Sequence, residues 1–331
     1  MKKNKENTSE THFENQIFLE DVPKSETNLN AQWYGEMGIQ PVNYVQNDQN
    51  SNHYSIYKAP PMQIPISLLD GYTMQGRVKI RWWYCDQQMG YGTLQETSLE
   101  DRLVDFTEED PFRANTEKLI SFKKNEVDEL IEQVRDKSIK YYGDMAKCLH
   151  SAFEKFPIKD QNVAIMGSTH PVCEAYAIFY GATPNTIEYT KIYCHDERIK
   201  THTVKEYYDV PVDNRVKFDA GISISSFEHD GLGKYGDPLD PNGDIKAMEN
   251  MKNTIKKGGL LYLAVPCGED RIDWNAHRVY GDVRLPLLFS GWELLGSYGF
   301  ADEITKITPF HELEERKGYG YRHVLFILKN T

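Results

Sequence analysis

The chain has 331 residues, 40% of them hydrophobic, which is enough for one large domain with an extension. Its formal net charge of −12 at pH 7 argues against general binding to nucleic acids or anionic membranes, because their phosphates would be repelled. The five cysteines are widely spaced without a C-x-x-C pair, which argues against a disulfide framework or a structural zinc site and favours a cytoplasmic location.

The first part of the chain divides into two regions of different composition. Residues 1–29 are polar and charged, without the apolar segment of a signal peptide or a membrane span, and we expect a disordered tail. Residues 30–124 are an extension rich in aromatic residues and prolines, in which residues 77–84 alternate well enough for a strand. This extension is interpreted either as irregular cover on the main domain or as an aromatic cap over a substrate, around Trp82 and Trp83.

An α/β domain is predicted from residue 125 to residue 331. Residues 125–153 have apolar side chains at helical spacing and form one helix or two, with a break at Gly143. Further strands are expected at 162–166, 186–189, 218–224, 260–265 and 323–328, and further helices at 172–180, 245–257 and 287–295. Asp244 would cap a helix, and Pro266 would stop a strand. This alternation indicates a Rossmann-like, mostly parallel sheet with helices on both faces.

A polar loop follows the apolar strand at 218–224. Its hydroxyl, carboxylate and imidazole side chains are concentrated at five positions: Ser225, Ser226, Glu228, His229 and Asp230. Because ligands of open α/β sheets bind beyond the carboxyl ends of strands, this loop is a predicted site. Three further acidic residues are expected to make turns and a helix cap: Asp237, Asp240 and Asp244.

Two more candidate groups, His277 and Arg278, follow the next predicted strand and would lie at the same edge of the sheet. Together with His229 and Asp230 they form a candidate catalytic set, because histidine titrates near neutrality and a neighbouring carboxylate tunes its pKa. The same side chains suit a metal ion as an alternative, although we assign no metal ligand.

From Val163 onward the order of motifs resembles that of class I S-adenosylmethionine-dependent methyltransferases. The segments that carry this resemblance are 163–167, 181–182, 187–188, 218–229 and 255–266. In that family Gly167 would begin the cofactor loop, and Glu188 would end the second strand and bind the ribose hydroxyls. The resemblance also implies S-adenosylmethionine contacts from five other residues: Ser168, Thr169, Ser225, Ser226 and Glu228.

The cofactor loop departs from the methyltransferase pattern. Ile165 stands where the family has an acidic residue, and Thr169 and Pro171 replace later glycines. Glycines allow a backbone to approach a ligand closely, and proline lacks an amide donor. The departure favours functions other than S-adenosylmethionine binding.

A closer resemblance is to a family named domain of unknown function 268. It is carried by FEHDGLGKYGDPLDPNGD at 227–244 and NAHRVYGDVRL at 275–285, and it extends over about residues 120–330. This family is related to the methyltransferase fold, which implies a fold more than a reaction.

Three hypotheses remain open. The first is a methyltransferase that uses S-adenosylmethionine on a small molecule or a glycan, with no nucleic-acid or membrane partner. The second is a different enzyme on the same fold, acting on sugars or with a metal. The third is a non-catalytic binding protein that has lost the cofactor site. Fold alone does not choose among them.

Overall fold

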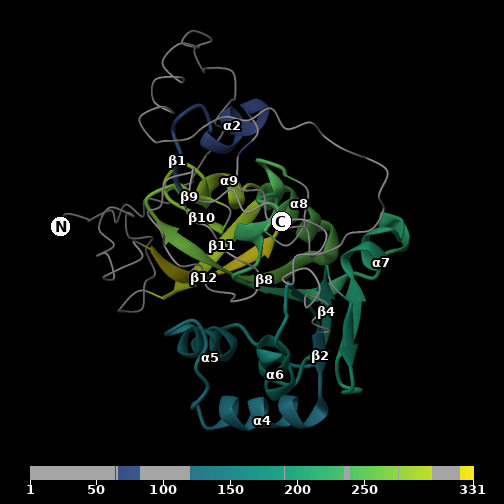
Figure 1. The fold of residues 1–331 in the computed structure, drawn as a ribbon. Coiled ribbons are helices and arrows are strands. Elements are labelled where there is room, and N and C mark those ends of the chain that lie inside the picture. The colour runs from purple at the N-terminus through teal and green to yellow at the C-terminus, as the bar shows by residue number, and fades with distance from the viewer. Residues whose placement is uncertain are drawn as a thin grey trace, which may run out of the picture. The chain divides into compact units, whose positions relative to one another are not determined.

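The computed structural model describes residues 64, 66–82, 120–189, 191–234, 239–274, 276–299 and 321–331 (Figure 1). The predicted tail 1–29, most of the extension including Trp83, and Asp237 lie outside these ranges, and the proposed domain boundaries stay predictions. Within the described ranges, no helix is long and apolar enough to cross a bilayer.

A seven-stranded sheet is the centre of the fold, with the strand order β11-β12-β8-β7-β3-β4-β6. Five strands run parallel: β3 (Asn162–Met166), β4 (Thr183–Glu188), β6 (Lys200–Thr203), β7 (Phe218–Ile224) and β8 (Ile255–Gly268). β12 (Tyr321–Asn330) runs antiparallel between β8 and β11 (Trp292–Tyr298). The predicted mostly parallel α/β sheet is confirmed.

Helices cover both faces of this sheet, as Figure 1 shows. One face carries α4 (Lys124–Arg135), α5 (Met145–Lys155) and α6 (Val172–Phe179), and the other carries α7 (Val204–Tyr208), α8 (Gly243–Thr254) and α9 (Leu285–Leu288). Alternate residues of a strand face opposite sides. On β12, Leu325 and Ile327 therefore join the first core, while Val324 and Phe326 join the second. The predicted break is present as residues 136–144 between α4 and α5, and it includes Gly143, whose φ is 68°.

The predicted helix 245–257 and strand 260–265 are wrong at their boundary. α8 ends at Thr254, and β8 begins at Ile255, which pairs with Phe218 of β7. Pro266 does not stop β8. Because β7 ends at Ile224, opposite Ala264, Pro266 lies past the last β7 pair and its missing amide costs no hydrogen bond to that strand.

The predicted helix 287–295 is wrong beyond Leu288, because residues 289–291 form a turn and residues 292–295 belong to a strand. α9 covers only Leu285–Leu288, and the chain turns at Gly291, whose φ is 70°, before β11 begins at Trp292. A short apolar run does not by itself distinguish a helix from a strand. Pairing with β12, which places Trp292 opposite Asn330, decides the conformation here.

Two smaller sheets join early segments to later ones. β1 (Lys79–Trp82), which confirms part of the strand predicted at 77–84, runs parallel to β9 (Arg271–Trp274), and β9 pairs antiparallel with β10 (His277–Val279). β2 (Ile120–Phe122) runs parallel to β5 (Ile192–Cys194). The helix α2 (Ile66–Thr73) precedes β1, and 3₁₀ turns occupy Val212–Asn214 and Phe227–His229.

Candidate functional site

A pocket of about 360 Å³ lies beyond the carboxyl ends of β3, β4 and β7. From β3 the chain builds the sheet outward through β4 and β6, and then returns to the other side of β3 with β7 and β8. β3 and β7 are therefore the neighbours between which the strand order reverses. Ligands of open α/β sheets bind at this position, and the volume is in the range of small-molecule sites.

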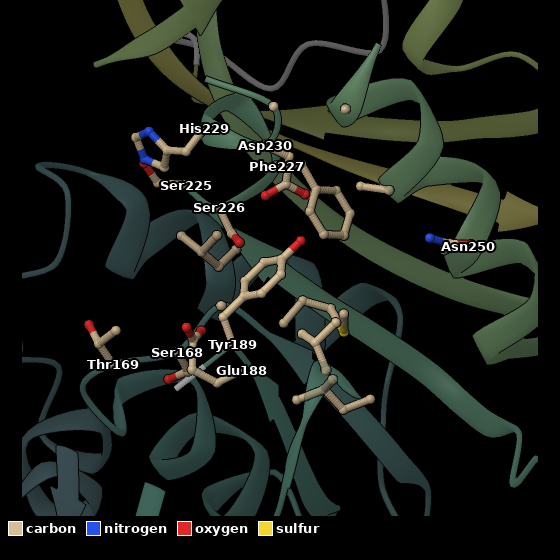
Figure 2. Close-up of a pocket in the computed structure, with 18 of the residues that line it drawn as sticks. Ser168, Thr169, Glu188, Tyr189, Ser225, Ser226, Phe227, His229, Asp230 and Asn250 are labelled. Atoms are coloured by element: carbon tan, nitrogen blue, oxygen red, sulfur yellow. The ribbon is translucent and has the colours of Figure 1, made fainter. Parts of the chain in front are cut away.

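The pocket brings together most of the residues predicted for the site. Eight of them line it: Gly167, Ser168, Thr169, Glu188, Ser225, Ser226, His229 and Asp230. In Figure 2, Ser168, Thr169 and Glu188 lie on one side of the pocket, and Ser225, His229 and Asp230 lie on the other. Glu228, His277 and Arg278 are not among the lining residues.

Gly167 lets the loops after β3 and β7 come into contact. Its φ is 68°, and a Cβ at this position would lie 2.0 Å from the hydroxyl of Ser226. Its amide donates to the carbonyl of Ile187 at 3.1 Å, which ties the loop to the end of β4. Glycine is required here by backbone conformation and by the close approach of Ser226.

A buried carboxyl group on α6 holds the loop that follows β3. Glu174 of α6 is fully buried and accepts hydrogen bonds from Ser168 Oγ at 2.9 Å and from Thr186 Oγ1 at 2.6 Å. Burial raises the pKa of Glu174 to about 7, although these hydrogen bonds oppose the shift. The Ser168 hydroxyl is thus turned toward Glu174, and the backbone of the loop is the part that faces a ligand.

The loop backbone offers donors to such a ligand. Among the described residues, we find no hydrogen-bond acceptor for the backbone amides of Ser168, Thr169 and His170, all of which line the pocket. Successive loop amides without partners favour a negatively charged group. Pro171, which lacks an amide, is at the N-cap of α6 and is not a lining residue.

The end of β4 supplies a carboxylate and an aromatic wall. Glu188 is the last residue of β4 and is only 9% exposed, and Tyr189 follows it. Figure 2 shows the Tyr189 ring and the Asp230 carboxylate pointing into the same space. Tyr208 and Phe227 also line the pocket. The sequence predicted Glu188 but none of these aromatic residues.

Three neutral imidazoles gather beside the loop after β7. The rings of His229 and His277 lie 6.3 Å apart, and His323 of β12 contacts Ser225 Oγ through Nε2 at 3.1 Å. Burial lowers the pKa of His229 and of His277, in the second case against the opposing effect of the nearby Asp273 carboxylate. Burial and the neighbouring His277 lower the pKa of His323 to about 4. All three rings are therefore uncharged at pH 7.

His229 has a defined tautomer. Its Nδ1 lies 2.5 Å from the Ala276 carbonyl, which can only accept, and 3.5 Å from Lys234 Nζ, which can only donate. The much shorter contact with the carbonyl places the proton on Nδ1. Its Nε2 is then the basic atom and lies 3.7 Å from Glu228 Oε1. This arrangement keeps a proton acceptor at the edge of the pocket.

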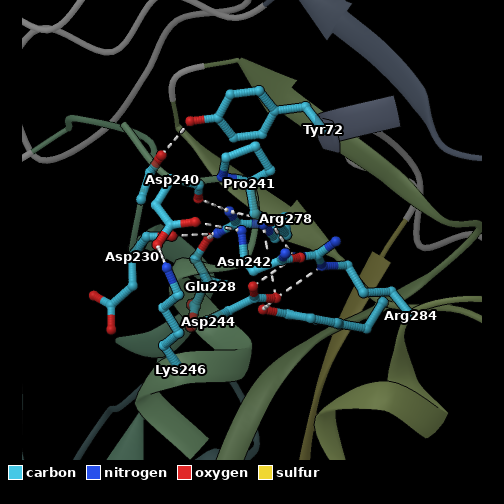
Figure 3. A network of polar contacts seen from close by, with 12 residues as sticks. Tyr72, Glu228, Asp230, Asp240, Pro241, Asn242, Asp244, Lys246, Arg278 and Arg284 are labelled. Carbon is cyan, nitrogen blue, oxygen red and sulfur yellow. Dashed lines mark hydrogen bonds and ion pairs between the residues drawn. The ribbon is translucent and has the colours of Figure 1, made fainter. Parts of the chain in front are cut away.

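Arg278 holds the loop from behind rather than facing the pocket. Its side chain is fully buried, and its guanidinium donates to backbone carbonyls of Glu228, Asp230, Asp240 and Pro241 (Figure 3). These hydrogen bonds hold both ends of the loop, residues 228–230 and 240–241, to the same buried guanidinium. Arg278 therefore positions the loop after β7.

Asp244 is not the helix cap that the sequence predicted. Asn242 is at the N-cap of α8, while Asp244 is fully buried and accepts from Arg284 Nε at 2.8 Å and from Tyr280 Oη at 3.0 Å. Burial alone would raise the pKa of Asp244, but the charges of Arg278 and Arg284 outweigh it and lower the pKa. By contrast, Asp240 makes the predicted turn, since its Oδ1 accepts from the amide of Asn242 at 2.9 Å.

Several groups that contact the loop were missed by sequence reasoning. His323 contacts Ser225, Arg284 binds Asp244, and the Tyr72 hydroxyl of α2 donates to the carbonyl of Gly231. These partners are between 40 and 159 residues away along the chain. No local pattern predicts such contacts, although Arg284 does fall within the motif at 275–285.

Metal ligands were considered because of the acidic and imidazole side chains. In the part of the chain that the structure describes, no three histidine, cysteine or acidic side chains are grouped to hold a metal ion.

Comparisons with known proteins give a family and a set of similar folds. Residues 160–331, which are 172 of the 331 residues, match the model of a family described as Caenorhabditis protein of unknown function, DUF268. No curated protein matches the chain by sequence.

Three solved structures with similar folds are methyltransferases. The 1,6-didemethyltoxoflavin-N1-methyltransferase of Burkholderia thailandensis, with bound S-adenosylhomocysteine, has 10% identity and a TM-score of 0.40 over 62% of this chain and 87% of its own. The N-methyltransferase NodS of Bradyrhizobium japonicum WM9 has 11% identity and a TM-score of 0.35 over 60% and 96%. An S-adenosylmethionine-dependent methyltransferase of Clostridium acetobutylicum has 9% identity and a TM-score of 0.37 over 62% and 98%.

Replacing Arg278 tests whether it holds the loop. Arg278→Met keeps the length of the side chain but removes every guanidinium donor, and we expect the free energy of unfolding at pH 7 to fall by about 3–5 kcal/mol in urea titrations. Arg135→Met is the control, because Arg135 is exposed and pairs with Glu132 in its own helix, and it should change the value by less than about 0.5 kcal/mol. Equal effects of the two substitutions would contradict the positioning role.

The raised pKa of Glu174 predicts that the stability of the protein depends on pH. Its pKa is raised from 4.5 to about 7 in the folded protein, so its contribution to stability is present below pH 4.5 and is lost as the pH rises through about 7. Glu174→Gln has no such loss. Measured by urea unfolding, the variant should therefore gain up to about 3 kcal/mol relative to the wild type between pH 4.5 and pH 8. A stability difference independent of pH would show that Glu174 is not a buried, titrating acid.

Proposed function

The chain belongs to the DUF268 family, and on this premise we propose that it is a methyltransferase that uses S-adenosylmethionine and methylates a small molecule or a glycan. The observation that carries the proposal is the position of the pocket. It lies at the strand-order reversal, with a carboxylate at the end of β4 and, after β3, loop amides for which the described residues offer no acceptor. These are the positions at which a Rossmann-like sheet binds a nucleoside.

The pocket residues fit the nucleoside part of this cofactor. Glu188 offers carboxylate oxygens, which accept hydrogen bonds from a pair of ribose hydroxyls. Tyr189, Tyr208 and Phe227 provide flat apolar surfaces beside it, which suit a purine ring. A nucleoside bound here would bury both its polar edge and its apolar faces against matching groups.

The β3 loop fits the amino-acid part of the cofactor. The amides of Ser168, Thr169 and His170 favour a carboxylate, and Gly167 brings this loop against Ser226. Two departures from the methyltransferase pattern lie outside the pocket. Ile165 is buried in the core between the sheet and its helices, and Pro171 is not a lining residue. These two departures therefore do not count against cofactor binding, whereas the third, Thr169 in place of a glycine, does line the pocket.

The residues of the β7 loop act on the acceptor. When bound, S-adenosylmethionine supplies an electrophilic methyl group, so the protein must orient a nucleophile and, for a hydroxyl, accept a proton. Asp230 and His229 line the pocket, and the neutral His229 has a basic Nε2. Either side chain can hold the acceptor by a hydrogen bond.

Calorimetric titration with S-adenosylhomocysteine tests the proposal. We expect micromolar binding to the wild type and a loss of at least tenfold in affinity for Glu188→Ala, because hydrogen bonds to a charged group contribute about 1.5–3 kcal/mol each. Glu249→Ala, on the exposed side of α8, is the control and should bind as the wild type does. No binding to the wild type at high micromolar ligand would exclude the proposed cofactor.

A further inference from the structure

Ser225 is held in an unusual backbone conformation where β7 meets the pocket. Its φ is 53°, a left-handed value that residues other than glycine seldom adopt. Such a conformation costs free energy and persists where the surrounding structure requires it, often at functional sites. Here it follows directly after the last residue of β7, and Ser225 is a lining residue of the pocket.

The Ser225 hydroxyl connects two titratable groups, the buried Glu228 and the half-buried His323. It donates a hydrogen bond to Glu228 Oε1, and it lies 3.1 Å from His323 Nε2. A hydroxyl has only one proton to donate. While that proton is on the Glu228 side, His323 Nε2 must donate to Ser225 Oγ, so the three groups form a directed chain from His323 to Glu228.

Glu228 is suited to take up a proton. It is fully buried, and among the described residues its second oxygen, Oε2, has no hydrogen-bond partner. Burial raises the pKa of Glu228 to about 7, against the opposing effects of the Ser225 hydrogen bond and of the charges on Lys234 and Arg278. The titratable and charged groups that face it from the loop, β8, β10 and the residue after β10 are His229, Lys234, Cys267, Arg278 and Tyr280.

His323 closes the other end of the chain and stays uncharged. Its ring lies 5.0 Å from the ring of Tyr142, which lines the pocket, and 5.7 Å from the ring of Tyr321. Burial and His277 lower the pKa of His323 to about 4. At neutral pH the ring therefore changes its tautomer, and not its charge, when Ser225 changes the direction of its hydrogen bond.

We propose that Ser225, Glu228 and His323 form a proton relay that deprotonates a hydroxyl-bearing acceptor in the pocket. The acceptor proton moves to Ser225 Oγ while the Ser225 proton moves to Glu228 Oε1, so one carboxylate becomes one carboxyl group and no other proton is needed. Ser225 is the residue that touches the acceptor, and Glu228 and His323 position it. This inference rests on the proposed function, which supplies the acceptor. The hydrogen bonds among the three groups are present without a cofactor.

The relay has two hydrogen-bond directions that depend on pH. Above about pH 7 Glu228 is ionised, Ser225 donates to it, and His323 carries its proton on Nε2. Below about pH 7 the neutral Glu228 donates to Ser225, Ser225 donates to His323 Nε2, and His323 carries its proton on Nδ1. The capacity to accept a proton is thus present above this pH and is lost below it.

Nitrogen NMR of the full chain with labelled histidines tests the relay without any ligand. The His323 signals, assigned by their absence in His323→Gln, should change from one neutral tautomer to the other with a midpoint near pH 7. Glu228→Gln and Ser225→Ala should each abolish this transition, the first by removing the titrating group and the second by removing the link.

The matched control is Glu174→Gln. Glu174 is an equally buried carboxyl group with a raised pKa and a serine partner, but its partners are Ser168 and Thr186, so its replacement should leave the His323 transition in place. A His323 signal that does not respond to pH, or that still responds in Ser225→Ala, would overturn the relay.

Titration of the same variants with S-adenosylhomocysteine separates this inference from the proposed function. Glu228 lies outside the pocket lining, so Glu228→Gln should bind this ligand within about twofold of the wild type. If the wild type binds the ligand and His323 does not respond to pH, only the relay fails. If His323 responds and the wild type does not bind, the proposed cofactor fails and the relay remains.

Discussion

The buried guanidinium of Arg278 is the interaction on which the site depends. An arginine with no solvent contact needs partners for its donors and its charge. Here backbone carbonyls from residues 228–241 accept from both terminal nitrogens, while Nε has no hydrogen-bond partner among the described residues and lies 3.7 Å from the carboxylate of Asp244, which balances the charge. The loop after β7 has little regular structure of its own, so this cation determines its path. Ser225, His229 and Asp230 reach the pocket because that path is set from behind.

The sheet supplies the other constraint, because the reversal of strand order leaves a space beyond β3 and β7 that side chains of both loops can line. Gly167 narrows this space on the β3 side, and Glu174 supports the same loop from within the core. Two buried carboxyl groups, Glu174 and Glu228, therefore lie on either side of the pocket. Each is bonded to a serine of a strand-end loop, and each has a pKa raised by burial to about 7.

The sheet, and the edge of it at which the site lies, could be predicted from the sequence, because strand periodicity and polar strand ends are local signals. The sequence did not predict the conformation or partner of a residue where a contact far along the chain determines it. Trp292 is in a strand because β12 pairs with it, and Asp244 is an ion-pair partner because Arg284 lies 40 residues further along. His277 and Arg278 were expected at this edge of the sheet, and they are not among the residues that line the pocket. His323, which contacts Ser225, lay in a strand that was predicted only for its apolar residues.

A crystal structure of the protein with S-adenosylhomocysteine is the most direct test of the central claim, which is that the strand-order reversal holds a nucleoside cofactor. The account predicts the ribose hydroxyls at Glu188, the amino-acid carboxylate at the amides of residues 168–170, and the sulfur facing the loop that begins at Ser225. Ligand bound elsewhere, or a pocket that stays empty in crystals soaked at millimolar concentration, would contradict it.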